Sequence, residues 1–221
     1  MERNSPPVKQ PRRYDSARRQ AQARQTRAAI LAAARRRFLS DGFAATTIAA
    51  IAAGAGVSAD TIYKSFGGKP GLVRAIYEKS LAGAGRRHAE TRSDELQATE
   101  PDPRVIMRGL GQLAAEVAPR VAPVVLLIRD AAAADPDMAA LKAELDSQRL
   151  QRMTDNARTL AAAGHLRPGI TVEEAGEIGW TYSAPELYEL LVLTRGWPLE
   201  RYATFIADAL AAHLLPREAT T

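Results

Sequence analysis

Side chains that can bond to phosphates and to base edges gather in one short stretch of the chain. This polar set consists of Ser58, Asp60, Thr61, Tyr63 and Lys64, with the small residue Ala59 beside them. Lysine and tyrosine can reach phosphates, and the two hydroxyls can bond to phosphates or to base edges. Two apolar residues, Ile62 and Phe66, lie four positions apart, which is the spacing of one helix face. The stretch therefore predicts a short helix with a buried apolar side and a polar side available to nucleic acid.

The residues before this helix predict the element that positions it. Thr47 can cap a helix that begins at Ile48, because its hydroxyl can accept from an unpaired backbone N–H. Gly56 lies where the chain must turn sharply with a positive φ, and Ser58 is the next cap. Two short helices joined by a glycine turn form a helix-turn-helix, which lays its second helix in the major groove of DNA.

Two residues near this helix leave their roles open. Asp60 could accept from a cytosine amino group, or it could cap the helix start and favour its dipole; we prefer the second interpretation. Lys69, in Gly67-Gly68-Lys69-Pro70, lies at the start of a third helix, where free amides and a cation suit a phosphate. The glycines of Gly54-Ala55-Gly56 do not indicate a nucleotide-binding loop, because no Gly-Lys-Ser/Thr follows.

The charge of the chain is divided between its two parts. Residues 1–92 hold 18 Lys and Arg against 6 Asp and Glu, a net of +12, and residues 93–221 hold 12 against 19, a net of −7. A basic head on an acidic body is typical of a nucleic-acid-binding protein, although a merely solvated Arg-rich helix gives the same count. The absence of cysteine excludes disulfides and thiolate metal sites. We find no apolar signal core and expect a soluble, cytoplasmic, all-α protein without a membrane span.

We expect three parts along the chain: a disordered basic tail over 1–18, the helix-turn-helix domain over 19–88, and a body over 89–217. The tail could enter a minor groove through Arg12, Arg13, Arg18 and Arg19, or it could simply add nonspecific attraction; we prefer the second. Apart from the two short helices, the expected helices cover about 21–41, 71–87, 104–117, 137–163, 172–195 and 198–214.

Several breaks are expected in and around the body. Residues 89–103 are polar and are predicted to be a connection, and Pro119 and Pro123 are predicted to interrupt a helix or to start the next one. Thr171 and Glu174 predict a capping box, and Pro185 is predicted to bend the helix that follows.

The motifs together resemble the TetR family of transcriptional regulators. The resemblance is carried by Ile30-Leu31-Ala32-Ala33-Ala34, Phe38 and Gly42, by Ile51-Ala52-Ala53 and Gly56-Val57-Ser58, and by Thr61-Ile62-Tyr63-Lys64-Ser65-Phe66 with Lys69. It covers about residues 25–80, with weaker likeness at Gly164–Gly169, Glu186–Tyr188 and Gly196–Pro198. Three positions depart from the family pattern, namely Asp60, Ser65 and Pro70. Asp60 puts the base preference in doubt, and not the binding itself.

The resemblance implies an all-helical homodimer of about nine helices, with a three-helix head and a body that holds an inducer. It implies repression of double-stranded operator DNA, relieved by a small ligand. Carried over by position, the DNA contacts are Thr47, Ser58, Thr61, Tyr63, Lys64 and Lys69, and Ala59 and Asp60 are included on the same helix. The dimer would form through the last two long helices, about 172–195 and 198–214.

The ligand-binding residues can only be guessed from size and place in the body. The candidates are Met107, Leu110, Leu127, Arg129, Trp180 and Tyr188, although we prefer core for each of the large apolar and aromatic residues and a salt bridge with an acid of the body for Arg129. We expect no enzyme, cofactor or metal site, because neither a catalytic constellation nor a metal-ligand spacing is visible. The alternative is a helical DNA-binding or architectural protein that needs no ligand.

Overall fold

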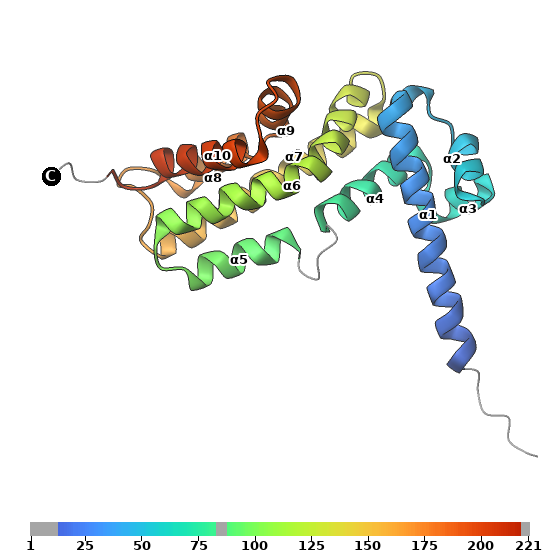
Figure 1. The fold of residues 1–221 in the computed structure, drawn as a ribbon, viewed down its shortest axis with the longest axis horizontal. Coiled ribbons are helices and arrows are strands. Elements are labelled where there is room, and N and C mark those ends of the chain that lie inside the picture. Colours follow the sequence, from blue (N-terminus) through green and yellow to red (C-terminus); the bar gives the residue numbers. More distant parts are fainter. Residues whose placement is uncertain (1–12, 83–87, 218–221) are drawn as a thin grey trace, which may run out of the picture.

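The computed structural model describes residues 13–82 and 88–217, and each regular element in these ranges is a helix (Figure 1). The head consists of α1 (Arg13–Ala45), α2 (Ile48–Ala55), α3 (Ala59–Phe66) and α4 (Lys69–Ala82). The body consists of α5 (Ala89–Thr99), α6 (Pro103–Ala132), α7 (Pro136–Ala162), α8 (Val172–Tyr182), α9 (Pro185–Tyr188), the π-helical segment η1 (Glu189–Thr194) and α10 (Leu199–Leu214). The predicted all-α fold, with a helix-turn-helix head and a helical body, is confirmed.

The first helix begins earlier than the sequence predicted. Residues 13–18 already belong to α1, so the prediction of a disordered tail is wrong for them, and residues 1–12, with Arg12, lie outside the described residues. Alanine, arginine and glutamine favour helices, and neither Pro nor Gly follows Pro11 before Gly42. Gly42, with φ of 80°, interrupts the helix where its end was predicted.

The head core continues into the body. Ile30, Phe38, Ile51 and Ile62 are buried at its centre. The same apolar cluster extends to one end of α6 and the start of α7 through Val124, Ile128, Met138, Leu141 and Leu145. In Figure 1 this end of α6 and α7 lies beside α1 and α4. The head is therefore packed against the body by buried apolar surface and not merely connected to it.

Helix α6 is the central helix of the body. It packs against α4, α7 and α10, and it runs unbroken through Pro119 and Pro123, so the predicted interruption there is wrong. Packing on several sides outweighs the local cost of the two prolines. By length and composition alone α6 could cross a membrane, but this is a weak indication, because central helices of helical bundles have the same properties.

Two further predictions about the body are corrected by the structure. Residues 89–99 form helix α5 instead of a connection, and they do so without a strong apolar stripe. The helix predicted over 172–195 does not bend at Pro185 but stops at Tyr182, and α9 and η1 follow as one continuous helical segment over 185–194. Proline cannot donate to the preceding turn, and here the interruption is complete. The Thr171–Glu174 capping box and the last helix are found as predicted.

Candidate nucleic-acid interface and body cavity

The helix-turn-helix is held by local interactions at each of its ends. Thr47 Oγ1 accepts from the amide of Ala50 at 3.1 Å and caps α2. Gly56 has φ of 67°, in the left-handed region, and its amide bonds back to the end of α2. Ser58 Oγ accepts from the amide of Thr61 at 3.2 Å and opens α3. These caps fix where α3 begins and in which direction it points.

The polar side of α3 faces away from the protein. Ile62 is fully buried, whereas 55% of Tyr63 is exposed, and the side chains of Asp60 and Lys64 are 70% and 77% exposed. Ser58 is exposed and Ala59 and Thr61 are half-buried at the helix start, where the Ser58 and Thr61 hydroxyls lie 2.9 Å apart. Thr47, at the start of α2, is also exposed. The polar residues of α3 that were predicted to meet nucleic acid thus remain accessible on the side of the helix opposite Ile62.

Asp60 has a partner that the sequence analysis did not consider. Its Oδ2 lies 2.8 Å from Lys64 Nζ, one turn further along α3. Both groups are well exposed, so the pair contributes little to stability. Its effect is electrostatic, because a carboxylate beside Lys64 lowers the positive potential of the face that would approach phosphates.

Lys69 is less available than the rest of this surface. Its Nζ donates to the carbonyl of Phe43 at 2.7 Å and lies 4.3 Å from the centre of the Phe43 ring. The lysine therefore ties the start of α4 to the end of α1. Its two remaining N–H donors are the ones that a phosphate could use.

One basic residue beside α3 was not among the predicted contacts. The Arg27 guanidinium stacks 4.5 Å from the centre of the Phe66 ring, and it lines an open groove together with Tyr63, Lys64 and Arg74. Arg74 is engaged by Glu144 through two hydrogen bonds of 2.6 and 2.5 Å. Arg27 extends the cationic surface from α3 onto α1. In the sequence, Arg27 is one of several arginines in the segment expected to be helical over about 21–41.

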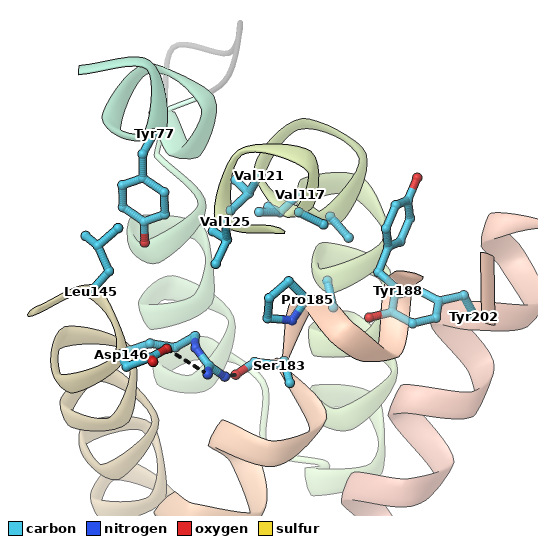
Figure 2. A pocket seen from close by; sticks show the side chains of 15 residues that line it. Tyr77, Val117, Val121, Val125, Leu145, Asp146, Ser183, Pro185, Tyr188 and Tyr202 are labelled. Atoms are coloured by element: carbon cyan, nitrogen blue, oxygen red, sulfur yellow. Dashed lines mark hydrogen bonds and ion pairs between the residues drawn. The ribbon is translucent and has the colours of Figure 1, made fainter. Parts of the chain in front are cut away.

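The body encloses a cavity with two chambers. The larger, of about 480 Å³, lies among α4, α5, α6, α7, α8 and α10, and the smaller, of about 140 Å³, lies toward α9 (Figure 2). Six residues line both chambers: Tyr77, Ala114, Val117, Val121, Arg149 and Ser183. The volume of the larger chamber is in the range of small-molecule sites, and most of its wall is apolar.

Arg149, on α7, is a charged residue at the junction of the two chambers. Only 19% of its side chain is exposed, and burial lowers its pKa. Its guanidinium donates to the carbonyl of Trp180 and to Ser183 Oγ, and it stacks 4.4 Å from the centre of the Trp180 ring. Asp146 Oδ1 accepts from it at 3.4 Å. These contacts fix the guanidinium in the cavity wall.

Three tyrosines line the smaller chamber. Tyr77 comes from α4, and Figure 2 shows its hydroxyl pointing toward the side of the chamber that holds Asp146. Burial raises the pKa of Tyr77, and it raises the pKa of Tyr202 to about 12. Tyr188 and Tyr202 pack edge to face with ring centres 5.8 Å apart. All three hydroxyls are thus neutral near pH 7 and can act as hydrogen-bond donors.

The six predicted ligand residues do not come together in the structure. Leu110 lines the larger chamber and Tyr188 the smaller one. The other four line neither chamber: Met107 and Leu127 belong to the apolar clusters, Trp180 packs on Arg149, and Arg129 donates to Glu189 at 2.7 and 3.2 Å. The ion pair of Arg129 is the alternative that the sequence analysis allowed.

The residue that the sequence analysis missed here is Arg149. It lies in a stretch of α7 with several other charged residues, and nothing local separates it from Arg152 or Arg158. The one available signal was its position four residues after Leu145, which is buried, because this spacing places Arg149 on the same inward face of the helix.

Comparison with known proteins shows a sequence match for the head and a fold match for most of the chain. Residues 30–76 match the sequence profile described as bacterial regulatory proteins, tetR family. No curated protein sequence matches the chain. Among solved structures, NalD, the secondary repressor of the MexAB-OprM multidrug efflux pump in Pseudomonas aeruginosa, is 19% identical with a TM-score of 0.68, and the match covers 90% of this chain and 100% of NalD.

Two other solved structures share the fold. SmeT, in complex with triclosan, is 22% identical with a TM-score of 0.67, and the match covers 89% of this chain and 94% of SmeT. The ketosteroid transcriptional regulator KstR2 of Mycobacterium tuberculosis is 20% identical with a TM-score of 0.55, and the match covers 86% of this chain and 95% of KstR2. Residues 30–76 therefore carry the helix-turn-helix sequence of the tetR family, and the backbone of the chain follows the fold of TetR-type regulators over most of its length.

Proposed function

We propose that this protein is a transcriptional repressor that binds palindromic operator DNA as a homodimer and is released by a small-molecule inducer. The observation that carries the proposal is the exposed polar face of α3, a helix anchored by Ile62 and capped at both ends. An anchored helix with free polar side chains is suited to the major groove.

The proposed DNA contacts fall into two kinds. Lys64, Lys69 and Tyr63 contact phosphates, which supply affinity and orientation without reading sequence. Ser58, Thr61 and the start of α3 with Ala59 lie where base edges are read, and Thr47 contacts the backbone from α2. Asp60 tunes the charge of Lys64 through their ion pair.

The homodimer is supported by apolar side chains that stay exposed near the end of the chain. Leu190 and Leu193 on η1 are 54% and 56% exposed, and Leu199 and Phe205 on α10 are 42% and 36% exposed. These residues fall within the two segments predicted to form the dimer interface. A two-fold pairing of this surface buries them and places two heads on one DNA face, with half-sites about 34–36 Å apart.

The inducer is supported by the body cavity. Tyr77 lies in its wall and belongs to α4, the helix that directly follows the helix-turn-helix and whose Leu72, Val73 and Ile76 are buried in the head core. A ligand that binds better when α4 is displaced shifts the dimer toward a state in which the heads no longer fit the operator.

Selection of DNA from a random pool by the purified, ligand-free protein tests the proposal. The expected result is a palindrome that the protein shifts in a gel at low ionic strength. A lack of retained DNA at low salt, or an enriched site without two-fold symmetry, contradicts it. Light scattering on the same preparation gives the oligomeric state.

A further inference from the structure

The charged side chains that line the body cavity differ in their exposure to water and in their ion-pair partners. Glu78 on α4, His88 just before α5 and Glu90 in the first turn of α5 are exposed, and water screens their charges. Arg152 has its own partner, because its guanidinium donates to Asp94 at 2.6 Å. The ionic groups that remain within the wall are Arg149 and Asp146.

The positive charge of Arg149 is not fully balanced by Asp146. Asp146 Oδ1 lies 3.4 Å from Arg149, whereas its Oδ2 accepts from Lys142 Nζ at 2.7 Å. One carboxylate is thus shared by two cations, and the closer of them is Lys142. The remaining hydrogen-bond and stacking partners of Arg149 are neutral: the Trp180 carbonyl and ring, and Ser183 Oγ. Glu186 acts on Arg149 only through its charge, and its carboxylate also pairs with Arg129 at 3.8 Å. A desolvated cation of this kind is stabilised by an anion that enters the cavity.

We propose that the cavity takes an amphiphilic monoanion, an apolar skeleton with a single carboxylate or equivalent group that docks on the Arg149 guanidinium. The proposal rests on the proposed function, since it names the ligand class of the same cavity. The apolar skeleton fits the larger chamber, whose wall includes Leu110, Leu113, Met153 and Leu214. Among the residues that the structure describes, a second anionic group would meet no further unbalanced cation in this wall.

Tyr77 supplies the link from this anion to the head. Its hydroxyl makes no hydrogen bond to another described residue, and it faces the side of the chamber where Asp146 lies (Figure 2). An anion held by Arg149 on α7 can therefore accept from Tyr77 on α4. A ligand in the cavity then contacts α4, the helix that follows the helix-turn-helix, through Tyr77.

Binding is tested on the full chain with matched acid and amide probes in the absence of DNA. The probes are decanoate, dodecanoate and 1-naphthaleneacetate, each with its primary amide, and decylammonium as the cation. Trp180 packs on Arg149, so its fluorescence in a Trp197→Phe background reports binding at the junction. We expect at least one acid to bind saturably and roughly 10- to 100-fold more tightly than its amide. Equal binding of acid and amide, tighter binding of decylammonium, or no saturable binding of any acid overturns the proposal.

A pair of α7 variants assigns the effect to Arg149. Arg149→Gln should remove most of the acid-over-amide preference, whereas Arg158→Gln, an exposed arginine on the same helix outside the cavity, should keep it. Preference retained in a folded Arg149→Gln variant overturns the assignment. Should Arg149→Gln fail to fold, Tyr77→Phe provides the second test, and its acid-over-amide preference should fall at least about threefold. Because DNA selection uses ligand-free protein, failure of the probes and failure of operator binding are separate results.

Discussion

The guanidinium of Arg35, in the middle of α1, donates a hydrogen bond of 3.2 Å to the main-chain carbonyl of Arg120 in α6. A second nitrogen of Arg35 donates to Ser80 Oγ at 3.2 Å, and Arg120 Nε donates to the carbonyl of Ser80 at 3.3 Å. Helices α1, α4 and α6 therefore meet at one polar junction between head and body. Burial at this junction lowers the pKa of Arg35, because removal from water disfavours the charged guanidinium.

Replacing Arg35 by Gln should lower the free energy of unfolding by about 1–3 kcal/mol, because the Arg120 carbonyl and the Ser80 hydroxyl lose a charged donor. Urea unfolding followed by circular dichroism measures the change. Arg36→Gln is the matched control, since Arg36 is the next residue on α1 and is exposed. Equal stability of the two variants would show that the junction contributes nothing to the fold.

The ion pair of Asp60 and Lys64 leads to opposite predictions for DNA binding. Lys64→Ala should weaken association about equally across sequences and reduce the slope of log K against log salt by about one. Asp60→Asn should strengthen nonspecific association at low salt, because Lys64 loses its neighbouring carboxylate. Fluorescence anisotropy over a series of salt concentrations measures both effects. Lys79→Ala, which removes an exposed lysine in the last turn of α4, is the control. An unchanged slope in Lys64→Ala would exclude a phosphate contact.

Two glycines of α6 should respond differently to alanine. A Cβ at Gly111 would lie 2.3 Å from the carbonyl oxygen of Ala203 in α10, whereas a Cβ at Gly109 would meet the tip of the Leu96 side chain at 2.5 Å. The Leu96 side chain can rotate, but the backbone of α10 cannot move without disturbing the core. Gly111→Ala should therefore destabilise the protein by about 1–3 kcal/mol. Gly109→Ala should be neutral or slightly stabilising, because alanine favours the helical conformation more than glycine does. Thermal unfolding of both variants under the same conditions measures the two changes in stability.

The exposed leucines of η1 predict the site of dimerisation. Leu193→Glu places a charge on the proposed interface and should weaken self-association by at least about tenfold. Sedimentation equilibrium measures the dissociation constant. Leu39→Glu changes a residue of the head that is 42% exposed and should leave association unchanged. A dimer equally stable in Leu193→Glu would place the interface elsewhere.

The Arg129–Glu189 pair predicts a dependence of stability on pH. The hydrogen bonds from Arg129 hold the pKa of Glu189 below its ordinary value of 4.5. The unfolded chain then binds the proton more readily, so this stabilisation is complete above that value and is lost as the pH falls through the folded-state pKa. The stability difference between the parent protein and Glu189→Gln should therefore shrink from about pH 6 to about pH 3. Chemical unfolding along this pH series checks it, and Glu200→Gln, an exposed change at the start of α10, should show no such trend.

The sequence was most informative where the structure is local. The caps Thr47 and Ser58, the turn at Gly56 and the capping box of Thr171 depend on a few neighbouring residues, and each lies where it was predicted. The exposed polar side of α3 follows from the same pattern, since burial of Ile62 fixes which residues face outward.

The errors concern features that distant segments determine. Helix α5 has no strong apolar stripe, and Gln97 joins it to α7 through a hydrogen bond of 3.2 Å to Asn156. The course of α6 through Pro119 depends on packing against several other helices, among them α4, α7 and α10. The cavity is lined from many elements, so the special position of Arg149 cannot be seen in the sequence of α7 alone.

The apolar cluster that crosses from the head into α6 and α7 has a consequence for protein engineering. A chimera cut after α4 would leave Leu72 and Ile76 without the surface formed by Val124, Ile128 and Met138. Transplanting this recognition module onto a foreign sensor therefore requires grafting the adjoining tips of both body helices, residues 124–145, along with residues 13–82.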